Sequence, residues 1–128
     1  MKVLFLSFII LLTCTFVPAQ SPEQVVVKNG ERKVARTGRI TIKFLELIED
    51  SRCPTDINCV WAGIARIKVE LARNGKTSVV ELNTQNEKTA KFQGHIITLK
   101  DLQPRQSTTS KYSPSAYSAT LGISKIAR

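Results

Sequence analysis

The sequence predicts an all-β fold, a single-domain antiparallel β-sandwich with one short-range disulfide. Apolar and polar residues alternate with a period of two in several segments, most regularly over 65–71, as in strands with one buried face. Turn formers separate these segments, including the hairpin dipeptide Asn74-Gly75. No apolar repeat of helical period is found after residue 20. A small β-barrel is the alternative fold.

Residues 1–19 are interpreted as a signal peptide for export. Lys2 supplies the positive start, an apolar run follows, and Val17-Pro18-Ala19 offers a cleavage site before Gln20. The apolar run is too short for a transmembrane helix, which needs about 20 residues, so we expect no membrane span. Residues 20–128 then form one β-domain of a secreted or periplasmic protein.

Cys14 offers a competing interpretation of the leader. The string Leu11-Leu12-Thr13-Cys14 resembles a lipoprotein box, in which the Cys carries a lipid anchor. Thr13 fits that box poorly, whereas Val17-Pro18-Ala19 fits a signal-peptidase site well, so no lipid anchor is expected. Removal of Cys14 would leave two cysteines, an even number that suits an oxidising compartment.

Three strands are predicted in the segment before the central cysteines, residues 25–48. A β-branched run over 25–28 ends at Asn29-Gly30, a hairpin signal, so a returning strand is expected at 32–36. Residues 39–48 form a longer strand in which the alternation shifts its phase, which is explained by a bulge near Leu45 or by cover on both faces of the strand.

The clearest hairpin joins the strands on either side of Asn74-Gly75. When Arg73 is paired with Lys76, Val69 lies opposite Val80, and apolar residues meet apolar residues along the pair.

The last third of the chain predicts two more strands and two connections. Residues 83–91 are polar and loop-like, and 94–102 read as a strand. A long surface connection rich in Ser and Thr follows at 105–115, and 117–124 alternate as the final strand. Six to eight short strands with a long crossover favour a sandwich.

The centre of the chain is a loop between Cys53 and Cys59, whose spacing lets a folded loop bring the two sulfurs together. Trp61 is expected to pack beneath this loop and to cap one end of the core. We predict that the tip of the loop is a binding site, because sandwiches commonly display binding loops at the ends of their sheets. The predicted binding residues are Arg52, Pro54, Thr55, Asp56, Ile57 and Asn58, with Trp61 and Gly63 in structural roles.

Metal and redox chemistry fit this loop less well. Structural zinc needs four ligands with cysteines two to four residues apart, whereas this pair is C-x5-C and His95 is the single His. A redox pair would be C-x-x-C. Oxygen ligands for calcium are offered by Glu49, Asp50, Asp56 and Asn58, but these residues lack the spacing and the glycine of a calcium loop. We therefore predict no metal and no cofactor.

The string from Asp50 to Gly63 follows the pattern D-x-R-C-P-x4-C-x-W-x-G. It resembles the signature of a family of small, secreted bacterial β-proteins of uncharacterised function. The resemblance covers only this short string and matches the rest of the chain in general style. It implies export and a disulfide, and it implies no mechanism.

Enzymatic activity is not expected. A Ser nucleophile needs an oriented base, and His95 opens an apolar strand in a chain without a Gly-x-Ser-x-Gly elbow. Glu49 and Asp50 are adjacent on a strand, so their side chains point to opposite faces and do not form a glycosidase pair. Asp50 is instead expected to pair with Arg52.

The formal net charge is +9, and the basic residues are spread along the chain without a block of like charge. Such a charge suits solubility and attraction to anions. Nucleic acid is excluded by export and by the absence of a recognition motif. The predicted function is a non-catalytic binding module for an unknown protein or an anionic envelope component. The alternative is an inhibitor of an extracytoplasmic protease, in which the loop 54–58 enters the cleft.

Export makes a first testable prediction. Protein recovered from its native compartment is expected to begin at Gln20 and to contain no free thiol, because Cys14 has left with the leader and Cys53 is bonded to Cys59. Intact-mass measurement with and without reduction checks both points. A lipid-modified N-terminus at Cys14, or two free thiols, would contradict the prediction.

Overall fold

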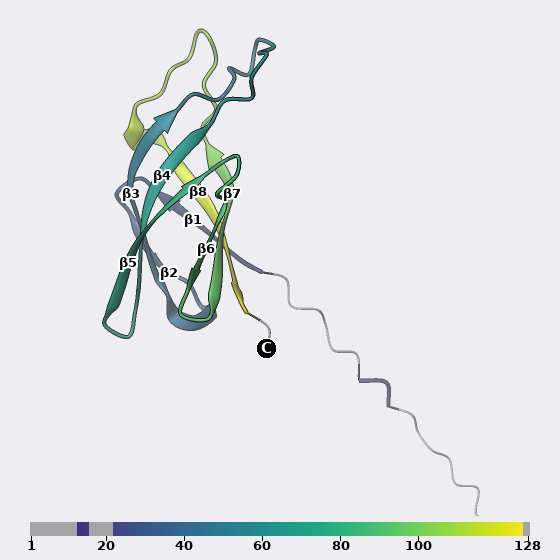
Figure 1. The fold of residues 1–128 in the computed structure, drawn as a ribbon, viewed down its shortest axis with the longest axis vertical. Helices are drawn as coiled ribbons and strands as arrows, with labels where there is room; N and C mark the ends of the chain where they lie inside the picture. The colour runs from purple at the N-terminus through teal and green to yellow at the C-terminus, as the bar shows by residue number, and fades with distance from the viewer. Residues whose placement is uncertain (1–12, 16–21, 127–128) are drawn as a thin grey trace, which may run out of the picture.

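A computed structural model describes residues 13–15 and 22–126 (Figure 1). In this part of the chain, two four-stranded antiparallel sheets pack as a sandwich. The strands are β1 (Glu23–Lys28), β2 (Arg32–Val34), β3 (Thr41–Asp50), β4 (Ala65–Arg73), β5 (Lys76–Asn83), β6 (Thr89–Phe92), β7 (His95–Gln103) and β8 (Ser118–Lys125). Two single-turn 3-10 helices, η1 (Thr37–Arg39) and η2 (Pro114–Ala116), lie in the connections.

The strand order is β1-β8-β7-β6 in one sheet and β2-β3-β4-β5 in the other. The predicted sandwich is confirmed. The alternative of a small barrel is wrong for the described residues, because each sheet keeps two edge strands and no strand pairing joins the two sheets.

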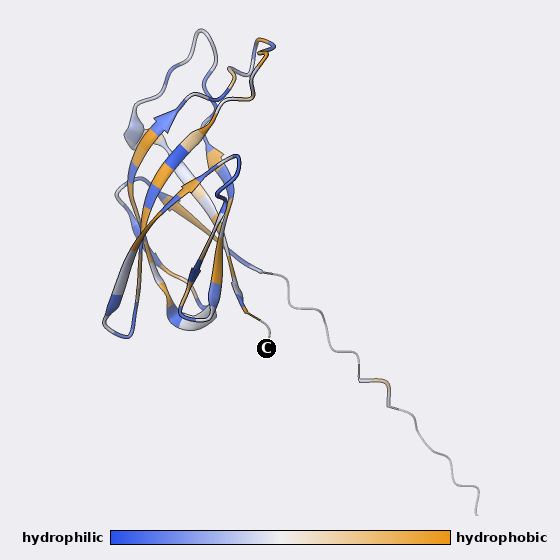
Figure 2. Cartoon of the chain, in the orientation of Figure 1, coloured by the Kyte–Doolittle hydropathy of each residue, from blue (hydrophilic) through white to orange (hydrophobic). Residues whose placement is uncertain are grey.

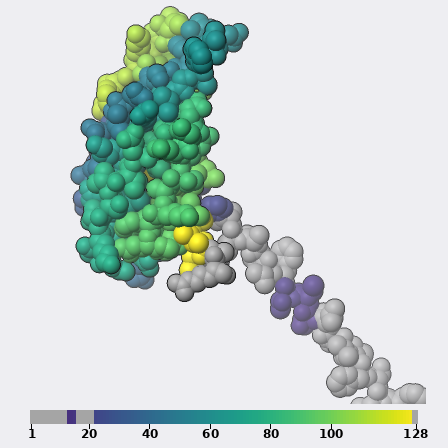
Figure 3. Space-filling view, viewed as in Figure 1, coloured from purple at the N-terminus to yellow at the C-terminus, as the bar shows by residue number. Residues whose placement is uncertain are grey.

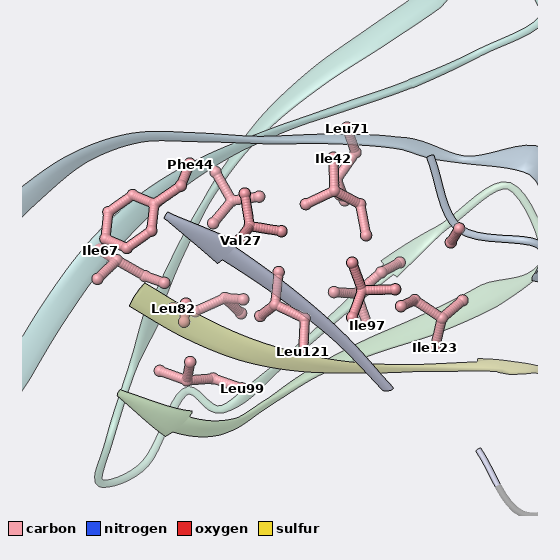
Figure 4. Packing of buried hydrophobic residues seen from close by; sticks show 14 of the residues in the cluster. Val27, Ile42, Phe44, Ile67, Leu71, Leu82, Ile97, Leu99, Leu121 and Ile123 are labelled. Carbon is pink, nitrogen blue, oxygen red and sulfur yellow. The ribbon is translucent and has the colours of Figure 1, made fainter. Parts of the chain in front are cut away.

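The core lies between the sheets and is made of the inward-facing residues that the alternation predicts. In β4, Ile67, Val69 and Leu71 are buried while the residues between them reach the surface, and Figure 2 shows the same alternation along the ribbon. Leu121 of β8 and Phe44 of β3, which come from opposite sheets, belong to the same core cluster, part of which is drawn in Figure 4. Burial of these side chains is the main stabilising term of the fold.

The hairpin of β4 and β5 has the predicted register. Arg73 pairs with Lys76 and Val69 with Val80, and Gly75 has a positive φ of 75° at the turn, as a two-residue hairpin turn requires. The predicted bulge is also confirmed, because the pairing of β3 with β4 shifts between Phe44 and Glu46.

The hairpin predicted at Asn29-Gly30 is wrong. β1 pairs with β8, and β2 pairs with β3, so the turn carries the chain from one sheet to the other. Val25 and Val27 of β1 are buried between the sheets, a burial that a two-stranded hairpin alone would not provide.

The polar segment 83–91 is only partly a loop. Its end forms β6, which pairs with β7 across a tight turn and sets Phe92 opposite His95. Tertiary pairing makes a strand here because Phe92 is buried against the core.

The predicted signal peptide, 1–19, lies outside the described residues apart from 13–15. In the described ranges there is no helix of the length and hydropathy that a membrane span requires. At one end of the sandwich, the β3–β4 connection and the β7–β8 connection project together (Figure 1).

The buried face of β8 makes a second prediction. Leu121→Ala removes a fully buried side chain and is expected to lower the free energy of unfolding by about 2–5 kcal/mol. Urea denaturation followed by circular dichroism measures it. Val34→Ala is the control, because Val34 is exposed and should change stability by less than about 0.5 kcal/mol. Equal effects of the two substitutions would contradict the assigned core.

Candidate functional site

The cysteine loop, residues 51–64, continues from β3 and β4 beyond the end of the sheets. Its stem extends the antiparallel ladder, because Ser51 N donates to Ile64 O at 2.8 Å and Cys53 N to Ala62 O at 3.2 Å. Beyond the stem, the Cys53–Cys59 disulfide closes the loop with the two Cα atoms 5.8 Å apart. Within the ring that the disulfide closes, the chain makes a turn in which Ile57 N donates to Pro54 O at 3.4 Å.

Gly63 is needed where the loop returns to β4. Its φ is +70°, a backbone conformation that side chains disfavour, and a Cβ there would lie 1.9 Å from Ser51 O in the opposite side of the stem. Glycine is therefore required at this position by both its φ and the close approach of the backbone.

A hydrogen-bonded cluster holds the base of the loop. The Arg52 guanidinium donates through Nε to Asp50 Oδ1 at 2.8 Å and through Nη2 to Asp50 Oδ2 at 2.9 Å. Tyr117 Oη donates to Asp50 Oδ2 at 2.6 Å, and Gln106 Nε2 donates to Tyr117 Oη at 2.6 Å. The expected pairing of Asp50 with Arg52 is confirmed. The pair is bidentate, with two parallel hydrogen bonds, which makes it stronger than a pair joined by one.

Arg52 also reaches across to the other sheet. Its Nη1 donates to Leu102 O at 2.7 Å, and its Nη2 donates to Pro104 O at 3.0 Å. The side chains of Asp50 and Arg52 are only 5% and 9% exposed. One guanidinium therefore joins the end of β3 to the end of β7, and its donors find acceptors despite their burial.

The cluster shifts the pKa values of its members. Burial alone would raise the pKa of Asp50, but the hydrogen bonds from Arg52 and Tyr117 outweigh it and hold that pKa below its ordinary value. The pKa of Tyr117 is raised, first by burial and then by its hydrogen bond to Asp50. Asp50 is thus ionised, and its carboxylate is stabilised by the hydrogen bonds from Arg52 and Tyr117.

The second projecting segment is the β7–β8 loop, residues 104–117, and it is bonded to the cysteine loop. Thr55 N donates to Gln106 O at 3.1 Å, and Thr108 N donates to Asp56 Oδ1 at 3.0 Å. The Thr108 hydroxyl donates to the other carboxylate oxygen of Asp56. Arg105 Nη2 donates to Cys53 O at 2.9 Å. The two loops therefore form one rigid end of the molecule.

The predicted position of Trp61 is wrong. Trp61 is 80% exposed and Val60 is 92% exposed, so neither caps the core. Trp61 belongs to the β3–β4 connection, which projects beyond the end of the two sheets (Figure 3), so the sandwich does not bury it. The end of the core is closed instead by the buried ring of Tyr117.

The other predicted site residues divide into two groups. Arg52 lies within the hydrogen-bonded cluster and is not available at the surface, and Pro54 and Gly63 are half-buried. Thr55, Asp56, Ile57 and Asn58 are exposed, as predicted for a displayed loop. With Val60 and Trp61, Ile57 makes up what we call the apolar tip.

Several residues of this end were not predicted from the sequence. Thr108 lies 52 positions from its partner Asp56, Tyr117 lies 67 positions from its partner Asp50, and Gln106 bonds to Thr55 N and to Tyr117. The one available signal was Tyr117 at the start of the last strand, since a buried tyrosine hydroxyl needs a partner. Nothing in the chain before that strand indicated Asp50 as the partner.

His95 lies at the far end of the molecule. It is buried, its Nδ1 lies 2.8 Å from Gln93 O, and its ring lies against Gly38. Among the described residues, the one hydrogen bond of its ring is to a main-chain oxygen. No group of three or more His, Cys, Asp or Glu side chains in the same part of the chain is placed to hold a metal ion.

Comparison with protein-family models, with curated proteins and with solved structures finds no match to this chain. The candidate site is therefore defined by its geometry alone: a disulfide-closed loop, a hydrogen-bonded base and an exposed apolar tip.

The buried charge at the base makes a third prediction. Asp50→Asn leaves Arg52 without its partner and is expected to lower the free energy of unfolding by about 3–5 kcal/mol at neutral pH. Because the folded-state pKa of Asp50 is below the unfolded value, its contribution is present above pH ~4 and is lost as the pH falls through the folded pKa. Denaturant unfolding at several pH values measures both effects.

The control for this prediction is Glu46→Gln. Glu46 forms an exposed ion pair with Lys68 at 3.2 Å, which should contribute less than about 1 kcal/mol. The acid-dependent loss of stability should be smaller in Asp50→Asn than in wild type, with a remainder from Glu23 and Asp56, whose pKa values are also lowered. If the free energy of unfolding of Asp50→Asn depended on pH as in wild type, Asp50 would not be the source of the acid-dependent loss of stability.

Proposed function

We propose that this protein is an exported, non-catalytic binding module that presents the cysteine loop to a partner. One observation carries the proposal: Val60 and Trp61 are neighbours in sequence and are almost fully exposed at the end of a projecting loop. Large apolar side chains gathered in this way on a soluble domain commonly mark a contact site. Tryptophan in particular is enriched among residues that dominate binding energy.

The way the loop is held supports the proposal. The disulfide, the ladder of the stem and the bonds from Thr108 and Arg105 order the tip before any partner arrives. A loop ordered in advance loses little conformational entropy on binding, so more of its contact energy appears as affinity. The disulfide is also in keeping with the oxidising compartment that export would provide.

The titratable groups at this end support binding better than catalysis. Asp50, Arg52 and Tyr117 satisfy one another within the base of the loop. The exposed Asp56 is held by Thr108, and hydrogen bonds to it lower its pKa. An exposed carboxylate held ionised in this way is a poor general base.

Inhibition of a protease remains the second candidate, and one observation favours it: the loop projects instead of folding flat. The conformation of 54–58 gives it less support. This segment is a turn, and Thr55 N is already bonded to Gln106 O. A substrate-like inhibitor offers an extended segment with free main-chain groups for pairing in the cleft.

The proposal makes a fourth prediction. The double substitution of Val60→Ala and Trp61→Ala removes most of the apolar tip and is expected to reduce retention on the envelope fraction of the source organism at least tenfold. Thermal stability should be unchanged, since both side chains are outside the core. Retention is measured with immobilised protein and washed envelope material.

The matched control is Val34→Ala with Val79→Ala. Both valines are more than half exposed but lie on strands β2 and β5, away from the cysteine loop. This variant should be retained like wild type. Equal retention of the tip variant and wild type would refute the proposed function.

A further inference from the structure

We infer that the partner of the cysteine loop is an anionic phospholipid surface, into which the apolar tip inserts at the level of the headgroups. This inference rests on the proposed function and names the chemistry of its partner. It depends on three features of the same end of the molecule: the composition of the tip, its size and shape, and the cations behind it.

The composition of the tip suits a membrane interface. Trp61 and Val60 project from one loop, and Tyr112 is half-exposed on the β7–β8 loop that is bonded to it. Tryptophan and tyrosine concentrate at membrane–water interfaces, where an apolar ring and a polar N–H or O–H are both solvated favourably. The exposed valines on β2 and β5, by contrast, stand singly and need no explanation.

The size and shape of the tip favour a membrane over a protein surface. Ile57, Val60 and Trp61 are three side chains on a convex loop, which stands clear of the sandwich in Figure 3. A standard protein interface uses about 20–30 residues from each partner. Shallow insertion into a bilayer instead combines buried apolar area with electrostatic attraction to anionic lipids, and it requires no complementary pocket.

Cations lie behind the tip. Residues 104–117 include Arg105 and Lys111 and no acid. A pocket of about 180 Å³ at the base of the loops is lined in part by Lys88, Lys100 and Arg105. Among the described residues none of these four cations forms an ion pair.

Two of the acids at this end are already engaged. Asp56 is bonded to Thr108, and Asp101, which also lines the pocket, accepts from Leu102 N and Gln103 Nε2. A phosphate group would therefore meet the ammonium groups of Lys88 and Lys100 here, whereas Arg105 already donates through Nη2 to Cys53 O. The net charge of +9 on the whole chain adds long-range attraction to an anionic surface.

The chain provides its own probe, because Trp61 is the single tryptophan. Protein purified from its native compartment is mixed with vesicles of phosphatidylglycerol and phosphatidylcholine, and with vesicles of phosphatidylcholine alone. With the anionic vesicles, we expect Trp61 emission to move to shorter wavelength and the protein to float with the lipid. Raising the salt to about 1 M, where the screening length is about 3 Å, should weaken binding strongly.

Two pairs of variants separate insertion from charge in the flotation assay. The double variant Val60→Ser, Trp61→Ser should float at least tenfold less than wild type, while Val34→Ser, Val79→Ser should float normally. Lys88→Gln, Lys111→Gln should weaken binding several-fold. The same loss of charge at the opposite end, in Lys76→Gln, Lys125→Gln, should weaken it less.

Absence of both the emission shift and flotation with anionic vesicles would overturn the inference. So would equal binding to vesicles without phosphatidylglycerol, since the cations would then have no role. If the protein binds neither kind of vesicle but still captures lipid-free envelope protein in a way that depends on Trp61, the partner is a protein. In that case the proposed function stands while this inference does not. If the tip variant matches wild type against both materials, both proposals fall.

Discussion

The structure depends on one buried ion pair at the end of the sandwich. The carboxylate of Asp50 accepts from Arg52 and from Tyr117, and the same guanidinium bonds to main-chain oxygens at the end of β7. Separating these charges would leave one of them desolvated without a partner, which is costly in a protein interior. The ends of the two sheets are consequently held together at the place where both projecting loops begin.

This arrangement separates the role of the disulfide from that of the core. The Cys53–Cys59 bond closes a short ring beyond the sheets, and such a ring constrains the unfolded chain only modestly, by roughly 2 kcal/mol in the loop-entropy model. The core is closed by Tyr117 and contains no side chain from the tip of the cysteine loop. The disulfide therefore serves mainly to shape the tip, and the ion pair joins the ends of the two sheets where the loop begins.

Because Trp61 lies outside the core, its side chain is exposed at the surface. A tryptophan that capped the core would contribute to stability and would leave the loop a polar surface. In its observed position it is exposed beside Val60, and the polar atoms of the loop are bonded inward to Thr108, Gln106 and Arg105. The end of the molecule thus combines a hydrogen-bonded polar support with an exposed apolar surface, and the proposed binding role rests on this combination.

The sequence by itself determined the fold class, the β4–β5 register, the bulge near Leu45 and the spacing that allows the disulfide, because all four depend on alternation, turn residues and separation along the chain. It also indicated the pairing of Asp50 with Arg52, which lie two positions apart. Only the tertiary structure decided that β1 pairs with β8, that Tyr117 joins the ion pair and that Trp61 is exposed. Each of these depends on what lies opposite a residue in space, and one-dimensional patterns do not contain that information when the partners are far apart in the chain.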